Sequence, residues 1–205
     1  MPSRSKRFSP FDDWAYSLLL GLYLGDGCVT ATARSYQLRV VLDGLYPEVI
    51  DDCVMAITLS LRDEVNVHVR PKPHDRGVVV EASSKRWPEV FPQHARGRKH
   101  ERPIVLQPWQ RQIVDRHPQA FLRGLIHSDG CRTVNRFKTT LPSGRIAEYA
   151  YPRYFFSNRS ADIRGLFCEY CERLGIRWTQ SNPRNISVSH RPSVELLDSF
   201  VGPKR

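Results

Sequence analysis

One nine-residue phrase occurs twice in this 205-residue chain, and it constrains the fold more than any other feature. Leu19–Gly27 reads LLGLYLGDG, and Leu122–Gly130 reads LRGLIHSDG. In each copy a small residue comes four positions after a glycine, and the phrase ends in Asp-Gly. Such an apolar segment predicts a helix with its small residues on one face. The duplication predicts two similar halves in which Asp26 and Asp129 hold equivalent positions.

The segments after each phrase are predicted to repeat one order of elements. Alternating apolar and polar residues predict strands, and helical spacing predicts amphipathic helices. In the strand over 65–72, Val65, Val67 and Val69 are expected to face the core. The first half is expected to contain strands over 29–34, 37–42, 65–72 and 78–84 and helices over 46–61 and 87–93. The second half is expected to contain strands over 132–140, 148–157, 176–179 and 185–189 and helices over 161–174, capped by Ser160, and 193–200.

The predicted fold class is α+β, with two pseudo-symmetric α-β-β-α-β-β-α halves packed through the repeated helices. Lys99 and Lys204 follow Asp26 and Asp129 at nearly equal distances, which supports the register of the repeat. The expected divisions are a basic flexible arm at 1–10, a first repeat at 11–102, a linker with a short helix at 103–117, and a second repeat at 118–205.

The charge of the chain indicates a polyanionic partner. The formal net charge is +10 and the isoelectric point is about 9.7. The chain contains no apolar run of roughly 18 residues, and residues 1–10 lack the apolar core of a secretory signal. Five cysteines do not fit a disulfide framework. We therefore expect an intracellular protein of the cytoplasm or nucleoid with nucleic acid as its partner and no membrane association.

The two aspartates are the candidate metal ligands. If the repeated helices pack together, Asp26 and Asp129 meet at two helix C-termini, where the helix dipoles and their mutual repulsion disfavour both charges. A divalent cation removes both penalties, and oxygen ligands favour Mg²⁺ over Zn²⁺. Such a site is suited to phosphodiester hydrolysis. The alternative is that each aspartate only caps the turn after its helix, but its presence in both copies favours the metal site.

The two phrases resemble the LAGLIDADG motif of homing endonucleases in the single-chain, two-repeat form. The resemblance implies a curved antiparallel four-stranded sheet in each half, placed against the DNA major groove. It implies catalytic metals on Asp26 and Asp129, with the carbonyls of Gly25 and Ser128 as further ligands. It also implies a basic residue near each active centre after the fourth strand. The candidates are Lys99 and Lys204, with Lys85 and His190 as the second choice.

The resemblance implies an Mg²⁺-dependent monomer that makes double-strand breaks in a long DNA target during intron homing, without a protein partner. Mn²⁺ is expected to substitute for Mg²⁺, and Ca²⁺ to bind without supporting cleavage. Two departures are that Leu24 and His127 replace the earlier acidic residue of the motif, and that the chain is short. A non-cleaving DNA-binding regulator and an RNA-splicing maturase remain alternatives on the same fold.

Outward-facing strand residues are expected to contact bases and phosphates. In the first half these are Thr30, Thr32, Arg34, Gln37, Arg39, Asn66, His68, Arg70, Lys72 and Lys85. In the second half they are Arg132, Arg136, Lys138, Tyr149, Tyr151, Arg153, Arg177, Asn185, Ser187 and His190.

The cysteines are expected to be structural. Cys168 and Cys171 have the spacing of half a zinc site, but they lie within a predicted helix and lack a second pair. Cys28 and Cys131 follow the repeated phrase and are expected to be small buried residues.

Overall fold

The computed structural model describes residues 9–61, 65–202 and 204. Residues 1–8, which form most of the expected basic arm, lie outside the described residues. In the described part, no helix has both the length and the apolar character needed to cross a membrane.

The repeated phrases form two helices that pack directly against each other. These are α1 (Asp13–Asp26) and α5 (Pro118–Asp129). A Cβ atom added to Gly21 would lie 2.9 Å from the Gly124 Cα, a distance that real Cβ contacts do not show. The two backbones therefore touch at the paired glycines. Every residue of α1 from Ala15 to Leu24 is buried, as the largely apolar phrase predicts.

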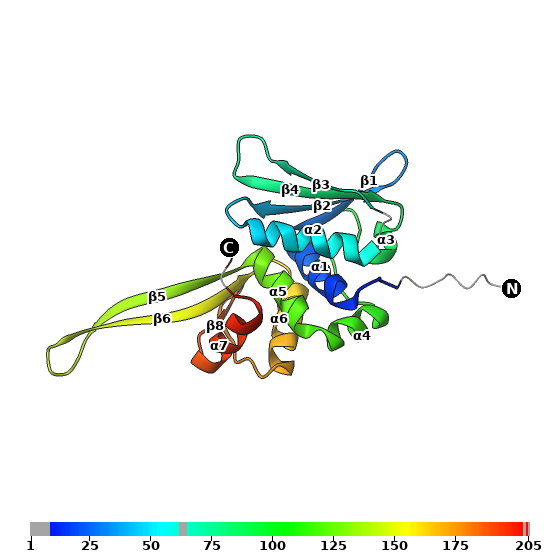
Figure 1. Cartoon of the computed structure of the whole chain (residues 1–205). Helices are drawn as coiled ribbons and strands as arrows, with labels where there is room; N and C mark the ends of the chain where they lie inside the picture. Colours follow the sequence, from blue (N-terminus) through cyan, green and yellow to red (C-terminus); the bar gives the residue numbers. More distant parts are fainter. Residues whose placement is uncertain (1–8, 62–64, 203, 205) are drawn as a thin grey trace.

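The first half builds a four-stranded antiparallel sheet beside α1. The strands lie in the order β1-β2-β4-β3, and the side chains of Leu38, Val40 and Val80 on its helix-facing side are fully buried. Helix α2 packs against this side (Figure 1). The elements are β1 (Gly27–Ala31), β2 (Tyr36–Asp43), α2 (Pro47–Leu61), β3 (Val67–Pro71), β4 (Gly77–Ser84) and α3 (Trp87–Val90).

The second half repeats this topology with the strand order β5-β6-β8-β7. Ser160 is the N-cap of α6, as predicted, and its hydroxyl accepts a hydrogen bond from the Ile163 amide at 3.4 Å. The predicted α+β class with two α-β-β-α-β-β-α halves is therefore confirmed. The elements are β5 (Gly130–Thr140), β6 (Ile146–Ser157), α6 (Ala161–Arg173), β7 (Thr179–Asn182), β8 (Asn185–Val188) and α7 (Arg191–Phe200).

The connection between the halves is packed into the core. It contains a 3₁₀ turn, η2 (Lys99–Glu101), and the predicted short helix, α4 (Pro108–Arg116). The buried Gln110 amide donates to the Tyr16 hydroxyl at 2.8 Å and pairs with Gln93. This buried polar network ties the connection to α1.

Two of the expected strand boundaries were wrong, and one residue expected to face the core is exposed. The first strand ends at Ala31 rather than at residue 34. Val69 lies on the helix-facing side opposite Val80, as predicted, but it is 50% exposed because β3 is an edge strand, whereas Val65 and Val67 pack against the core. The expected strand at 176–179 begins only at Thr179, because the Ile176 amide donates to the Cys171 carbonyl at 2.8 Å in the motif that ends α6.

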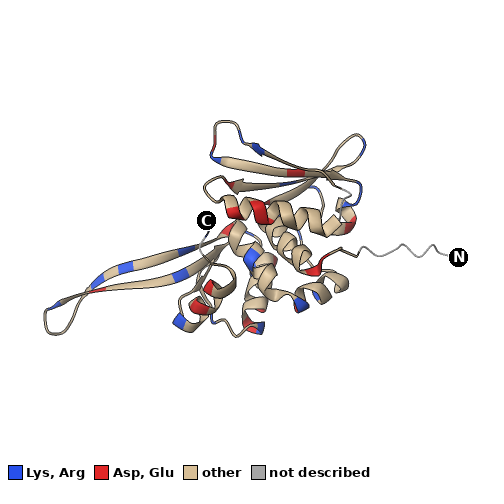
Figure 2. Ribbon diagram, in the orientation of Figure 1, with Lys and Arg blue, Asp and Glu red and all other residues tan. Residues whose placement is uncertain are grey.

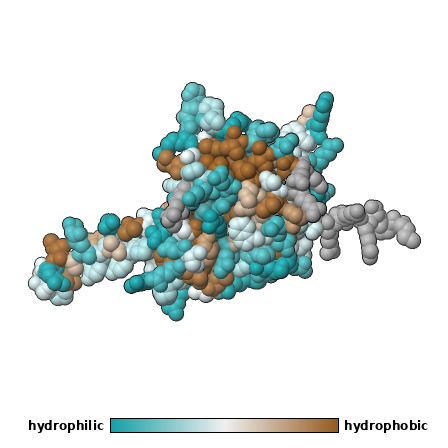
Figure 3. Space-filling view, viewed as in Figure 1, coloured by the Kyte–Doolittle hydropathy of each residue, from teal (hydrophilic) through white to brown (hydrophobic). Residues whose placement is uncertain are grey.

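The β5–β6 hairpin projects from the body of the molecule (Figure 1). Basic residues are spread along it (Figure 2), and hydrophobic residues lie among hydrophilic ones on its surface (Figure 3). Four large apolar side chains of the hairpin are at least 40% exposed, namely Val134, Phe137, Ile146 and Tyr151.

Candidate functional site

The packing of α1 against α5 brings the ends of the repeated phrases together. Asp26 and Asp129 are the last residues of the two helices. A Cβ atom added to Gly25 would lie 3.0 Å from Oδ2 of Asp129, so the end of one helix borders the carboxylate of the other. Asp129 is half-buried, and Asp26 is more open to solvent. The structure thus places two carboxylates at the centre of the pseudo-symmetric molecule and leaves them accessible.

The surroundings of both carboxylates favour their protonated form. The surrounding protein reduces the hydration of Asp26, and this loss, together with repulsion from Asp129, raises the Asp26 pKa to about 6. The pKa of Asp129 is also raised, mainly by loss of hydration, although its hydrogen bond with Asn158 opposes the change. Lys99 and Lys204 lower both values but do not restore them. Additional positive charge, such as a bound cation, would therefore stabilise the ionised form of both carboxylates.

Lys99 caps the end of α1. Its Nζ lies 2.5–2.9 Å from the carbonyl oxygens of Tyr23, Leu24, Gly25 and Gly27. An ammonium group at a helix C-terminus satisfies carbonyls that lack partners and complements the helix dipole. Loss of hydration lowers the Lys99 pKa to about 8, against the attraction of Asp129 and Asp26.

Lys204 is the pseudo-symmetric counterpart of Lys99. Loss of hydration lowers its pKa, and the carboxylates of Asp26 and Asp129 oppose this change, so the ammonium lies within electrostatic reach of both. Of the two basic pairs expected here, the structure therefore brings Lys99 and Lys204 to the aspartates. The second-choice residues lie on exposed turns, Lys85 after β4 and His190 at the N-cap of α7.

Asn158 makes the two halves of the site unequal. Its Nδ2 donates to Oδ2 of Asp129 at 2.6 Å, and its Oδ1 accepts from the Ser160 amide at 2.7 Å. In the first half, Asp43 accepts from the Leu45 amide at 3.1 Å in the same kind of turn. Sequence reasoning missed Asn158, because its bond to Asp129 joins residues that are far apart in the sequence.

A cavity of about 370 Å³ opens beside Asp129. Its lining includes Lys99, Asn158, Arg159 and Arg184. The two arginines are exposed and were not among the expected site residues. Because they flank a carboxylate that a cation would neutralise, they make this cavity suited to an anionic group such as a phosphate.

The donor set fits a hard divalent cation. Within the described ranges, no three His, Cys, Asp or Glu side chains form a metal-binding group, so Asp26 and Asp129 are the carboxylate donors available. Mg²⁺ commonly binds through one or two carboxylates and keeps several waters. The Gly25 carbonyl, an expected ligand, accepts a hydrogen bond from Lys99 but has a second lone pair. The Ser128 hydroxyl donates to the Gly124 and Leu125 carbonyls at 3.0 Å within α5.

The open face of the first sheet carries five of the expected DNA-contacting residues. Cross-strand pairing places Thr30 opposite Gln37, and places Arg39 and His68 on either side of Glu81. Glu81 forms ion pairs with Arg39 at 3.4 Å and with Arg70 at 3.0 Å, which holds both guanidinium groups on this face. The others lie outside the strands, in the β1–β2 turn (Thr32, Arg34), before β3 (Asn66), in the β3–β4 turn (Lys72, paired with Asp75) and after β4 (Lys85).

In the second sheet the expected residues divide between two faces. Tyr149, Tyr151 and Arg153 pair with Phe137, Asn135 and Thr133, so these six share the open face. Asn185 and Ser187 pair with Ser157 and Phe155, which also belong to that face, although Ser187 is buried. The partners Thr133, Asn135 and Phe137 were not expected, but the alternation of β5 could have indicated them.

The expectation that Arg132, Arg136 and Lys138 belong to the open face was wrong. They pair with Tyr154, Ala150 and Glu148, and the buried Tyr154 ring assigns this side of the hairpin to the helices. Arg132 donates to both carboxylate oxygens of Asp198 on α7 at 2.7 and 2.8 Å. Lys138 forms an ion pair with Glu148.

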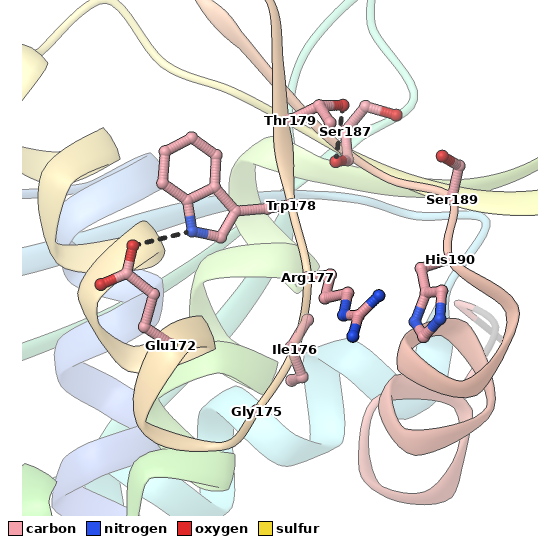
Figure 4. Close-up of a pocket in the computed structure, with 9 residues that line it drawn as sticks. All are labelled: Glu172, Gly175, Ile176, Arg177, Trp178, Thr179, Ser187, Ser189 and His190. Atoms are coloured by element: carbon pink, nitrogen blue, oxygen red, sulfur yellow. Dashed lines mark hydrogen bonds between the residues drawn. The ribbon is translucent and has the colours of Figure 1, made fainter.

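Three of the expected residues line a second pocket, of about 770 Å³, where β7 and α7 begin (Figure 4). They are Arg177, Ser187 and His190. Figure 4 shows the Arg177 guanidinium directed toward the His190 ring, while Trp178 turns away and donates to Glu172 at 3.2 Å. None of these residues borders the cavity beside Asp129.

Two cysteines are placed differently from expectation. Cys28 and Cys131 are exposed, because the strand alternation after the repeated phrase places them opposite Arg39 and Phe155 on the open faces. Cys171 is buried and Cys168 is half-buried in α6, in agreement with a structural role.

A comparison with protein-family models finds no match, and neither does a search of curated proteins. Solved structures do match. The homing endonuclease I-DmoI in complex with DNA and Ca is 16% identical with a TM-score of 0.56, over 92% of this chain and 89% of that chain. The LAGLIDADG homing endonuclease I-LtrWI bound to target DNA is 9% identical with a TM-score of 0.57, over 93% of this chain and 85% of that chain.

The same fold also occurs inside a longer protein. Full-length DUF199/WhiA from Thermatoga maritima is 14% identical with a TM-score of 0.56, over 94% of this chain and 56% of that chain. At these identities the likeness establishes the fold. The chain therefore has the fold of the LAGLIDADG homing endonucleases, as the sequence resemblance predicts.

Proposed function

We propose that this chain is a site-specific DNA endonuclease that uses divalent metal ions to hydrolyse both strands of a duplex. The observation that carries the proposal is the meeting of Asp26 and Asp129 at the ends of α1 and α5, with Lys99 and Lys204 beside them. Both carboxyl groups have raised pKa values and are accessible, so a bound cation would stabilise their charged forms. A role as turn caps alone gives no reason for this pairing.

Duplex DNA is the substrate that the surface favours. The net charge of +10 supplies long-range attraction to a polyanion. Each half presents an open sheet face with basic and polar side chains, beginning at the strand that follows its motif aspartate. The major groove of DNA is wide enough to admit a two-stranded β-ribbon. Several proteins with the same fold have been seen bound to target DNA. We propose that the chain acts as a monomer, since it contains both halves of the site.

In the proposed site Asp26 and Asp129 hold the metal, with Mg²⁺ as the physiological ion and Mn²⁺ as a substitute. The bound cation would lower the pKa of a water molecule and stabilise the charge that develops on the phosphate. The neighbouring Gly25 and Ser128 carbonyls are proposed as additional oxygen donors.

The two lysines are proposed to play different parts in the site, and neither is proposed as a metal ligand. With a pKa of about 8, Lys99 is largely protonated at neutral pH. Its ammonium group fixes the end of α1 through backbone carbonyls and so positions Asp26. Lys204 is proposed to stabilise the negative charge of the scissile phosphate on its side. Arg159 and Arg184 extend this positive surface around the cavity beside Asp129.

The test is a cleavage selection on a randomised duplex library with Mg²⁺. The unmutated chain is compared with the Asp26→Asn, Asp129→Asn double variant. We expect cut ends around one enriched sequence with the unmutated chain and none with the variant, while both chains enrich the same sequence by binding. An equal yield of cut ends from both chains would contradict the assignment.

Two other outcomes would favour the alternative functions. Binding that enriches one duplex sequence without cut ends, even with Mn²⁺, would indicate a non-cleaving regulator. Preferential binding to a structured RNA in a parallel RNA library would indicate a maturase.

A further inference from the structure

Three aromatic rings gather on one face of the β5–β6 hairpin. The ring centroids of Phe137 and Tyr149 are 5.3 Å apart, and Tyr151 lies 5.9 Å from each of them. Phe137 is 44% exposed and Tyr151 is 45% exposed. We call these three residues the aromatic trio. Exposed aromatic clusters are uncommon on soluble proteins and indicate contact surfaces.

The aromatic trio lies on the open face of the hairpin. Cross-strand partners share a face, and Phe137 is paired with Tyr149 while Tyr151 is paired with Asn135. Arg153 follows Tyr151 by two positions and lies on the same face, closer to the body of the molecule. Its guanidinium group is 5.3 Å from the Phe155 ring. The trio is therefore continuous with the surface proposed to contact DNA.

The charge of the hairpin as a whole favours a polyanion over an apolar protein surface. Glu148 is the only acidic residue between Gly130 and Ser157, and it is paired with Lys138 on the opposite face. Of the five basic residues in this stretch, Arg153 shares the face of the trio and Arg145 lies in the β5–β6 turn. The other three, Arg132, Arg136 and Lys138, lie on the opposite face.

The chemistry of Phe137 narrows what the trio can contact in DNA. Its side chain has no hydrogen-bonding atom, so it cannot read the polar edges of bases or bind a phosphate. The major groove presents one apolar group among the four bases, the C5-methyl group of thymine. Resting on the proposed DNA-cleaving function, we propose that the aromatic trio packs against thymine C5-methyl groups. It thereby selects thymine in the outer part of the target that the second half contacts.

The experiment uses the duplex that the unmutated chain enriches by binding in Ca²⁺. Each thymine is replaced in turn by deoxyuridine, which removes only the methyl group. Burial of one methyl group corresponds to about a fourfold change in affinity. We expect about fourfold weaker binding at one or two positions in one outer half-site, and full affinity when 5-methylcytosine is placed there with guanine opposite. Loss of affinity with 5-methylcytosine would show that the thymine carbonyl is being read instead, and would overturn the proposal.

Variants of the hairpin identify the source of the effect. Phe137→Ala should bind the thymine and deoxyuridine duplexes equally well, because the ring that senses the methyl is gone. Ile146→Ala is the matched control: Ile146 is 64% exposed on the opposite face of the same hairpin, and its loss should leave the fourfold difference intact. Tyr149→Phe and Tyr151→Phe should also keep the difference, because their rings remain. Unfolding by urea is followed for each variant to show that the fold is retained.

The outcomes separate the two proposals. Failure to enrich any duplex would overturn both the DNA-binding function and the thymine preference. A duplex that is enriched and cut, but is insensitive to deoxyuridine at every position, would overturn only the thymine preference. A concentration-dependent dimer in the unmutated chain that Phe137→Ala dissolves would also overturn it, by assigning the trio to contact between two copies.

Discussion

The two hairpins that follow the repeated helices occupy the same place in their sheets but differ in size. β1 and β2 have 5 and 8 residues, whereas β5 and β6 have 11 and 12. Both hairpins begin at the glycine after a motif aspartate and pair in the same sense. The base of the hairpin, next to the carboxylates, is thus kept alike in both halves, while the outer part varies.

The base and the outer part of each hairpin meet different structural requirements. The base must place Asp26 and Asp129 relative to each other, and it is held by the α1–α5 contact and the buried residues beneath the sheets. The outer part of the hairpin does not position the aspartates, so it can be longer and carry exposed aromatic residues without disturbing the core. Under the proposed function, the halves therefore share the chemistry and differ in which DNA they contact.

The largest expected effect tests whether the halves share the chemistry. Asp26→Asn and Asp129→Asn should each lower the rate of double-strand cleavage by about 1,000-fold or more, because several kcal/mol of charge stabilisation are lost. Both variants should bind the selected duplex as the unmutated chain does. Single-turnover cleavage and a gel-shift titration measure the two quantities. Cleavage at the ordinary rate by either variant would show that its half does not contribute a carboxylate.

The helix contact can be broken from either half. Gly21→Ala and Gly124→Ala should each destabilise the fold by about 2–3 kcal/mol, because the new methyl group collides with the backbone of the other helix. Gly165→Ala is the control, since this α6 glycine has no atom within 4 Å of an added Cβ and alanine favours a helix. Urea unfolding measures all three. Unchanged stability in the Gly21 and Gly124 variants would contradict the close approach of α1 and α5.

Asn158 and Asp43 lie at the turns that follow the second strands of the two halves, but they bond different groups. Asn158→Ala should lower cleavage about 10–100-fold, because Asp129 loses the amide that orients it. Asp43→Ala should have a smaller effect, because Asp43 bonds the Leu45 amide rather than a motif carboxylate. Cleavage rates of the two variants give the comparison. Equal losses would mean that the two turns play the same role.

The pH dependence should show the raised pKa of Asp26. Below pH 6 the cleavage rate should fall about tenfold per pH unit as this carboxylate is protonated, and a higher Mg²⁺ concentration should move the midpoint to lower pH. At a limiting Mg²⁺ concentration, a rate that is independent of pH between 5 and 7 would contradict a raised Asp26 pKa in the site.

The raised Asp26 pKa also makes the stability of the metal-free protein depend on pH. The folded state binds the Asp26 proton more tightly than the unfolded state does, since the folded pKa of about 6 exceeds the ordinary value of 3.8. This contribution to stability is present below pH 3.8 and is lost as the pH rises through about 6. Thermal melting of the unmutated chain and of Asp26→Asn over this range should converge at low pH, with the variant the more stable at pH 7.

The sequence predicted most of the fold because the repeat can be read twice. The element order, the contact of the repeated helices and the Ser160 cap follow from apolar spacing and local hydrogen bonding. The face of the sheet on which a strand residue lies was harder to predict. Arg132 is basic and lies in a strand, yet it faces Asp198, a partner that lies far away in the sequence. Asn158 was missed for the same reason, because its bond to Asp129 depends on how the second strand returns to the motif helix.

The central claim is that one metal site is assembled from both halves, and Ca²⁺ binding in the presence of the selected duplex tests it most directly. Isothermal titration should show Ca²⁺ binding to the unmutated chain, weaker binding to Asp26→Asn and to Asp129→Asn, and no detectable binding to the double variant. Binding of Ca²⁺ to the double variant with the affinity of the unmutated chain would show that the paired aspartates are not a metal site.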